Sequence, residues 1–126
     1  MLHPVNELTY TILLCDDIEA MKRFYRDLFP FEVRGEGETG IGFRAGSVLF
    51  SLRQRNRDYD GKGPRADVPG VQLAFRVSPA DVDSCYAELV ARDVRIAEPP
   101  TNQPRGHRTV YFHDPEGNLL EIYAEI

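Results

Sequence analysis

The sequence predicts an α+β protein built from two similar modules, each with the order strand, helix, strand, strand, strand. A β-branched strand pattern followed by an amphipathic helix occurs twice, and each helix is followed by three further strand-like runs. The length of 126 residues suits a single domain. We therefore expect one domain over residues 1–126, with module one at about 7–52, a linker at 53–69 and module two at about 70–126.

The first module begins with the apolar and β-branched run Leu8–Leu14, which predicts a strand. Asp16 is the expected helix N-cap, because an acidic residue follows it three positions later. An apolar stripe at helical spacing follows, made of Ile18, Met21, Phe24, Tyr25 and Leu28. Three more strands are expected at 31–34, 40–43 and 47–52.

The second module repeats this plan with a strand over Val71–Val77. Ser78 is the expected N-cap and Pro79 the first-turn residue of a helix with the stripe Val82, Cys85, Leu89 and Val90. Further strands are expected at 94–96, 109–112 and 118–123. The last hairpin turn, 114–118, places Gly117 where a positive φ is needed, and Gly46 is its equivalent in module one.

The composition excludes several classes of protein. The chain is 42% hydrophobic and 28% charged, which suits a soluble globular protein and not a disordered one. No apolar run approaches the ~18 residues of a membrane helix, and the N-terminus lacks a signal-peptide pattern, so we expect a cytoplasmic protein. The net charge of -5 disfavours nonspecific binding to nucleic acid or membrane. Cys15 and Cys85 lie far apart and indicate neither a disulfide nor a zinc site.

The linker carries a set of basic residues, Arg53, Arg55, Arg57, Lys62 and Arg65. One interpretation is a solvated loop whose charges have little effect. The other is a mobile basic flap beside a site for an anionic or aromatic ligand, because functional residues favour loops.

The paired modules, the motif at 114–123 (DPEGNLLEIY) and the helix segment at 24–28 (FYRDL) together resemble the vicinal oxygen chelate superfamily of glyoxalases, bleomycin resistance proteins and extradiol dioxygenases. The resemblance covers Leu8 to Ile126. It implies an open, U-shaped, barrel-like sheet of eight strands, with helices on the outer face and a cavity that commonly holds a divalent metal. It also implies a homodimer, formed by docking of whole chains or by exchange of modules.

The family places its metal ligands on the first and last strand of each module, which the resemblance carries onto Tyr10, Phe50, Gln72 and Glu121. A divalent metal needs about three firm nitrogen or oxygen ligands, and this set offers one carboxylate beside a phenol, an amide and a phenyl ring. We therefore expect no metal cofactor. The alternative is a divalent metal held by Glu121 with Gln72 and Tyr10.

The three histidines do not restore the missing ligands. His3 precedes the first strand and is expected at the surface. His107 and His113 lie at opposite ends of one expected strand, about 20 Å apart, so they cannot share a metal. Their expected roles are structural, with a role at a cavity rim as the alternative.

Alternation along the strands sorts inward-facing from helix-facing residues. The expected cavity lining is mainly aromatic with a few polar groups, as ligand pockets usually are. It consists of Tyr10, Ile12, Phe50, Leu52, Gln72, Ala74, Thr109, Tyr111, Glu121 and Tyr123. The aromatic residues could instead simply fill a core.

Two functions follow from this lining. The first is a metal-free protein that binds a partly aromatic or cationic small molecule, with Glu121 as a general acid or base or as an anchor for an amine. The second is a metal-dependent lyase, isomerase, dioxygenase or group transferase that uses Glu121. The ligand types favour the first.

Overall fold

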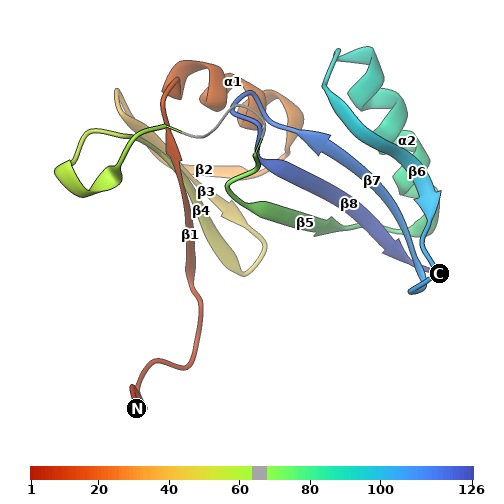
Figure 1. Ribbon diagram of the computed structural model, residues 1–126, viewed down its shortest axis with the longest axis horizontal. Helices are drawn as coiled ribbons and strands as arrows, with labels where there is room; N and C mark the ends of the chain where they lie inside the picture. The colour runs from red at the N-terminus through yellow and green to blue at the C-terminus, as the bar shows by residue number, and fades with distance from the viewer. Residues whose placement is uncertain (64–67) are drawn as a thin grey trace. The chain divides into compact units, whose positions relative to one another are not determined.

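The computed structural model describes residues 1–63 and 68–126 and divides into two units, Met1–Gly63 and Pro64–Ile126. Unit one contains β1 (Tyr10–Cys15), α1 (Ile18–Leu28), β2 (Glu32–Gly37), β3 (Gly40–Ala45), β4 (Val48–Gln54) and the 3-10 turn η1 (Asp58–Asp60). Unit two contains β5 (Gln72–Arg76), α2 (Pro79–Ala91), β6 (Ile96–Asn102), β7 (His107–His113) and β8 (Leu119–Glu125). The two βαβββ modules and the α+β class are thus confirmed (Figure 1).

Each unit is a four-stranded mixed sheet with one helix packed on one face. The strand orders are β1-β4-β3-β2 and β5-β8-β7-β6, so the first strand of each unit pairs in parallel with the last. The other neighbours are antiparallel. Helix α1 packs on β3 and β4, and α2 packs on β6, β7 and β8 (Figure 1).

Helix α1 begins one residue later than the sequence suggested. Asp17, rather than Asp16, is the N-cap, and its carboxylate accepts a hydrogen bond from the backbone N–H of Ala20 at 3.1 Å. The prediction for Asp16 was wrong because the helix starts at Ile18, which leaves Asp16 to face Arg55 at 3.4 Å. Side chains of the predicted stripe pack toward the sheet, with Ile18, Met21 and Tyr25 buried.

Helix α2 follows Ser78 and has Pro79 in its first turn, as predicted. The Ser78 hydroxyl donates to the carboxylate of Asp81 at 2.7 Å instead of capping a backbone N–H. Val90 was placed on the apolar stripe, yet it is 52% exposed while Leu89 is 1% exposed. Adjacent helical residues point about 100° apart, so only one of the two can face the sheet.

Aromatic rings fill the interior of unit one. Tyr25 from α1 lies 5.1 Å from the ring of Phe50 on β4, which lies 6.1 Å from Phe43 on β3. In unit two the layer beneath α2 consists mainly of aliphatic side chains with Phe112. Each sheet therefore has one buried face under its helix.

The hairpin turns have the predicted conformation. Gly46 has φ 67° and Gly117 has φ 83°, both in the left-handed region that glycine tolerates. Asp114 fixes the second turn, because its carboxylate accepts from the backbone N–H of Glu116 at 2.9 Å and of Asn118 at 3.1 Å.

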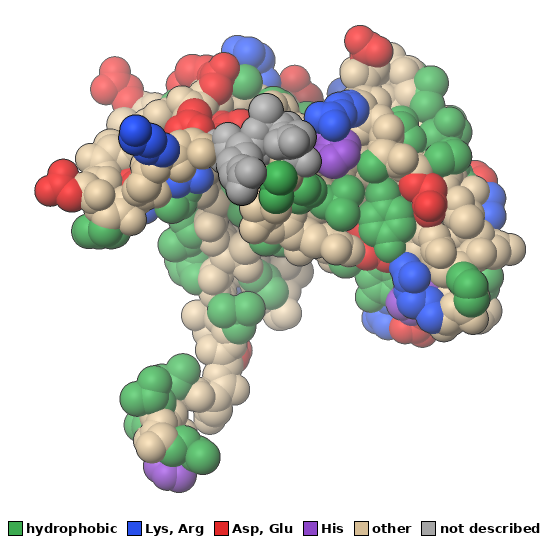
Figure 2. Space-filling model, in the orientation of Figure 1, with side chains coloured by type: hydrophobic (Ala, Val, Ile, Leu, Met, Phe, Trp, Pro, Cys, Tyr) green, Lys and Arg blue, Asp and Glu red, His purple; other side chains and the backbone are tan. Residues whose placement is uncertain are grey.

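The segment between the modules is partly structured. Strand β4 continues through Gln54, two residues into the expected linker, and η1 lies within it. Within the described ranges, no helix combines the length and apolar character needed to cross a membrane. The residues before β1 carry exposed apolar side chains, which Figure 2 shows gathered along the projecting N-terminal segment.

Candidate functional site

The face of the unit-two sheet opposite α2 carries most of the chemical groups that the sequence singled out. The β5–β8 register pairs Ala74 with Glu121, and the β7–β8 register pairs Tyr111 with Glu121. Gln72 and Tyr123 lie two positions away on the same face. The alternate residues of β7 and β8 face α2, and among them Phe112 and Leu120 are fully buried. The register thus brings together all six expected residues of this module.

Glu121 is the centre of a polar network on this face. Its side chain is 9% exposed, and the Gln72 amide donates a hydrogen bond to its carboxylate at 3.1 Å. The Arg105 guanidinium lies 3.9 Å from the other carboxylate oxygen and donates to the Tyr111 hydroxyl at 2.8 Å. The Glu121 carboxylate is therefore held by side-chain donors of the protein, and the Arg105 guanidinium balances its negative charge.

Arg105 was missed by the reasoning from sequence. It belongs to the turn between β6 and β7, where Gly106 adopts φ 91°. This turn returns the chain toward the sheet, so a side chain from it can reach residues of β7 and β8. A proline and a glycine flank Arg105 in the sequence, which was the available signal for a turn that carries a functional side chain.

Thr109 and Tyr123 each interact with a neighbouring side chain of the same unit. Thr109 is fully buried, and its hydroxyl accepts from the Gln103 amide at 2.9 Å. Tyr123 stacks on His107, with ring centroids 4.9 Å apart and an interplanar angle of 29°. Thr109 therefore supports the turn before β7, whereas the paired rings of His107 and Tyr123 present an aromatic surface.

His113 and His3 lie apart from the stacked rings of His107 and Tyr123. His113 lies at the far end of β7, and its Nδ1 is 3.3 Å from the Gly117 carbonyl oxygen in the last hairpin turn. His3 is exposed in the N-terminal segment. The two ends of β7 thus hold His107 and His113 in different surroundings, as the strand length predicted.

The prediction that Phe50 lines the cavity was wrong. Phe50 is 4% exposed and belongs to the layer beneath α1. Leu52 is among the residues that line the unit-one pocket, as expected, although it is 0% exposed and its side chain alternates with Ser51 in the same way as that of Phe50. Phe50 contacts the ring of Tyr25 from that helix. The physical reason is that β4 alternates two apolar residues with Ser51 and Arg53, and the apolar pair packs under the helix.

The register of β1 and β4 makes Ser51, rather than Phe50, the counterpart of the Glu121 ligand position. Ser51 pairs with Ile12 in the same way that Glu121 pairs with Ala74 in unit two. The Ser51 hydroxyl donates to the carbonyl oxygen of Ile41 at 3.1 Å. Unit one therefore offers Tyr10 and a hydroxyl already bound to the backbone at the two equivalent places.

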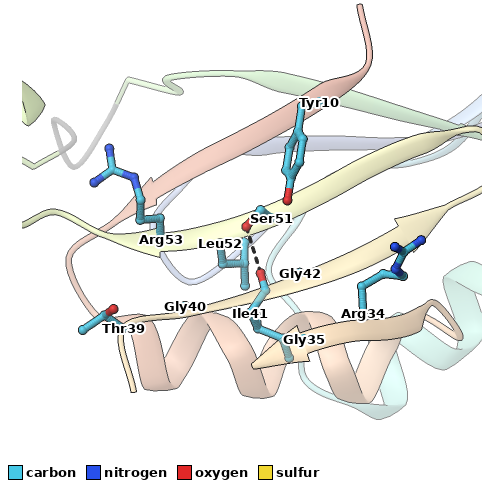
Figure 3. Close-up of a pocket in the computed structure, with 10 residues that line it drawn as sticks. All are labelled: Tyr10, Arg34, Gly35, Thr39, Gly40, Ile41, Gly42, Ser51, Leu52 and Arg53. Carbon is cyan, nitrogen blue, oxygen red and sulfur yellow. Dashed lines mark hydrogen bonds between the residues drawn. The ribbon is translucent and has the colours of Figure 1, made fainter. Parts of the chain in front are cut away.

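A pocket of about 370 Å³ lies on this open face of the unit-one sheet (Figure 3). Tyr10, which is 46% exposed, borders it from β1, and Ser51 lies at its centre on β4. Residues of β2 and β3 complete it, with Arg34 and Arg53 at opposite ends (Figure 3). Ile12, which is 49% exposed, lies on the same strand face as Tyr10.

Most of the basic residues at the end of β4 and directly after it are bound within their own unit. The two terminal guanidinium nitrogens of Arg53 donate to the Asp60 carboxylate, at 2.9 and 2.7 Å, and Arg55 donates to the Asp60 carbonyl oxygen at 2.6 Å. The hydrogen bond from Arg53, with those from the backbone N–H groups of Arg57 and Asn56, lowers the pKa of Asp60 far below its ordinary value, although burial opposes the shift. Lys62 is exposed, and Arg65 lies outside the described residues.

Residues 7–122 match the family described as the Glyoxalase/Bleomycin resistance protein/Dioxygenase superfamily. The chain belongs to this superfamily. The resemblance read from the last hairpin and the first helix is thereby confirmed.

Curated relatives of this superfamily member align over nearly its whole length. Metallothiol transferase FosB of Staphylococcus epidermidis is 27% identical over 126 residues, covering 98% of this chain and 85% of the relative. Virulence protein STM3117 of Salmonella typhimurium is 22% identical over 121 residues, covering 94% and 83%.

Solved structures share the fold at lower identity. A glyoxalase/bleomycin resistance protein/dioxygenase from Nocardioides has a TM-score of 0.80 at 23% identity, covering 96% of this chain and 84% of that one. Lactoylglutathione lyase from Agrobacterium tumefaciens has a TM-score of 0.75 at 24% identity, covering 96% and 95%. These likenesses concern the fold.

The name of metallothiol transferase FosB refers to a metal, which raises the question whether the side chains around Glu121 suit one. Among the described residues, no three His, Cys, Asp or Glu side chains are grouped to hold one. Glu121 supplies a carboxylate, but Gln72 turns an amide N–H toward it and Arg105 places a positive charge 3.9 Å away. A cation beside the carboxylate opposes a second cation. The residues of unit two therefore do not fit a divalent metal.

Proposed function

We propose that this superfamily member binds a partly aromatic or cationic small molecule without a metal. The observation that carries the proposal is the environment of Glu121, a nearly buried carboxylate whose partners are the Gln72 amide and the Arg105 guanidinium. A buried carboxylate with exchangeable organic donors can anchor a ligand donor group. The groups around Glu121 do not supply the further nitrogen and oxygen ligands that a metal requires.

The groups around Glu121 favour an aromatic ligand. The Tyr111 ring lies beside the carboxylate, and the stacked rings of His107 and Tyr123 lie on the same sheet face. Aromatic side chains can stack on a flat ligand, each pair adding on the order of 1 kcal/mol beyond burial.

A cationic ligand would bind by competing with Arg105. The Arg105 side chain is 53% exposed and its contact to Glu121 is 3.9 Å long, so a ligand amine can take its place at modest cost. The guanidinium also donates a hydrogen bond to Tyr111, which does not require the contact with Glu121.

Binding is tested with the whole protein by a thermal-shift screen of aromatic and cationic compounds, followed by calorimetry on each hit. Replacing Glu121 by Gln should weaken a cationic hit at least tenfold. The control is Glu125→Gln, because Glu125 lies on the same strand but is 68% exposed. Equal affinity in both variants, or no hit from the screen, contradicts the proposal.

The second candidate function is a metal-dependent group transferase, which the alignment with metallothiol transferase FosB favours. Elemental analysis of protein purified without chelators separates the two functions. Stoichiometric zinc, manganese, nickel or iron that disappears in the Glu121→Gln variant would support the enzyme. The homodimer and the cytoplasmic location remain predictions, and light scattering at several protein concentrations tests the first.

A further inference from the structure

Four glycines leave part of the unit-one sheet without side chains. Gly35 and Gly37 on β2 pair with Gly42 and Gly40 on β3, respectively. Ile41 and Phe43, which alternate with the β3 glycines, are buried under α1. The glycines therefore share the face opposite the helix, and we call this bare region the glycine strip.

The β2 register supports this facing independently. Glu36, between the two glycines of β2, points to the helix side, where it contacts Lys22 at 3.4 Å and forms an ion pair with Arg26. Both residues belong to α1. The glycine strip thus lies on the opposite face, where it forms much of the pocket floor (Figure 3).

The pocket over the strip has dimensions and edges that suit a flat molecule. Its volume of about 370 Å³ lies within the range of small-molecule sites. A β-carbon added at Gly42 would lie 3.9 Å from the Tyr10 hydroxyl, so this phenol reaches across β4 to the strip. A flat ring could therefore lie against exposed backbone with the Tyr10 ring at its edge.

The two arginines at the ends of the pocket differ in their availability. Arg53 is bound to the Asp60 carboxylate through both terminal guanidinium nitrogens. Arg34 is exposed, and within the described part of the chain no carboxylate or other acceptor is bound to it. Arg34 is therefore the cation that is available to a ligand, and a guanidinium binds carboxylate or phosphate groups by paired hydrogen bonds.

We propose that this pocket binds a flat organic anion, with the ring on Gly35, Gly40 and Gly42, the part of the glycine strip that lines the pocket, and the acidic group at Arg34. The inference goes beyond the proposed function, because it adds a second ligand class, an anion, and a recognition residue, Arg34. It uses residues of unit one alone and does not depend on Glu121.

The probe is naphthalene-2-carboxylate, compared with its neutral carboxamide by calorimetry on the full chain. Wild-type protein should bind the carboxylate at least tenfold more tightly than the carboxamide. Arg34→Gln should remove this preference, and Gly35→Ala should weaken the carboxylate at least tenfold because the new methyl group fills the strip. Nothing lies within 4 Å of a β-carbon at Gly35, so this variant should fold normally.

Gly37→Ala is the matched control, because it is the same change on the same strand, also with nothing within 4 Å, and Gly37 does not line the pocket. Its affinity for the carboxylate should be that of the wild type. Equal affinities for the two probes, or equal affinities in the Gly35 and Gly37 variants, would overturn this inference. If other aromatic or cationic compounds still bind through Glu121, the proposed function stands without it; if no compound binds, both fail.

Discussion

Replacing Phe50 by Ala tests the face that β4 turns toward its helix. Burying a phenylalanine side chain contributes about 1.5–3 kcal/mol, and each of its ring contacts with Tyr25 and Phe43 adds about 0.5–1.5 kcal/mol. Truncating a buried phenylalanine accordingly costs about 3–5 kcal/mol. This is a large part of the ~5–15 kcal/mol that stabilises a typical protein.

The assay is urea unfolding followed by circular dichroism, with Ile12→Ala as the control. Ile12 was also expected in the cavity lining but is 49% exposed, so its truncation should cost only about 1 kcal/mol. If Phe50→Ala leaves too little folded protein, Phe50→Leu should give a smaller loss of the same sign. A cost for Phe50→Ala no greater than that for Ile12→Ala would refute the assignment of Phe50 to the core.

Three further predictions concern single side chains. Asp60→Asn should lower the urea midpoint at pH 7. The difference in midpoint from the wild type should narrow below about pH 4, because a carboxylate whose pKa is lower in the folded than in the unfolded state stabilises the fold only at a pH above its unfolded pKa, and this stabilisation is lost as the pH falls. Burial, with a smaller effect of nearby carboxylates, raises the pKa of the Cys85 thiol, so its alkylation at pH 8, followed by mass spectrometry, should be slower than that of an exposed cysteine in a peptide. Gly46→Ala should cost about 1–2 kcal/mol in urea unfolding because its φ is positive, whereas Gly35→Ala should not.

Each of these predictions has an outcome that would contradict it. A gap between Asp60→Asn and the wild type that stays constant from pH 7 to pH 3 would show that ionisation of this carboxylate does not stabilise the fold. Alkylation of Cys85 at the peptide rate would mean that the thiol is not shielded in solution. Equal unfolding free energies for the two glycine variants would argue against a left-handed conformation at Gly46.

The element order was readable from the sequence because both modules repeat the same hydrophobic periods. The helix stripe with Met21 and Tyr25 and the turn with Gly117 are local signals, and the structure has both. The facing of β4 was harder to read. Phe50 is as suitable for a cavity wall as for a core, and its contact with Tyr25 shows that it belongs to the core.

Features that depend on the packing of distant segments were out of reach. Arg105 meets Glu121 because a turn folds back over the sheet, which no periodic pattern reports. The glycine strip depends on the pairing of β2 with β3, and that pairing shifts register between Val33 and Gly35. A one-residue change in register would have sent half of these glycines to the other face.

The pairing of first and last strands constrains how each unit assembles in time. Tyr10 pairs with Leu49 and Gln72 with Leu119, so β1 and β5 find their sheet neighbour only when nearly all of the unit has been synthesised. Closing such long loops costs entropy before any contact is gained, which slows folding. A ribosome that stalls before β4 would leave β1 with its backbone hydrogen-bonding groups unpaired, next to an exposed apolar N-terminal segment. Pairing of β4 with β1, and of β8 with β5, is therefore the step that satisfies one backbone edge of the first strand of each unit.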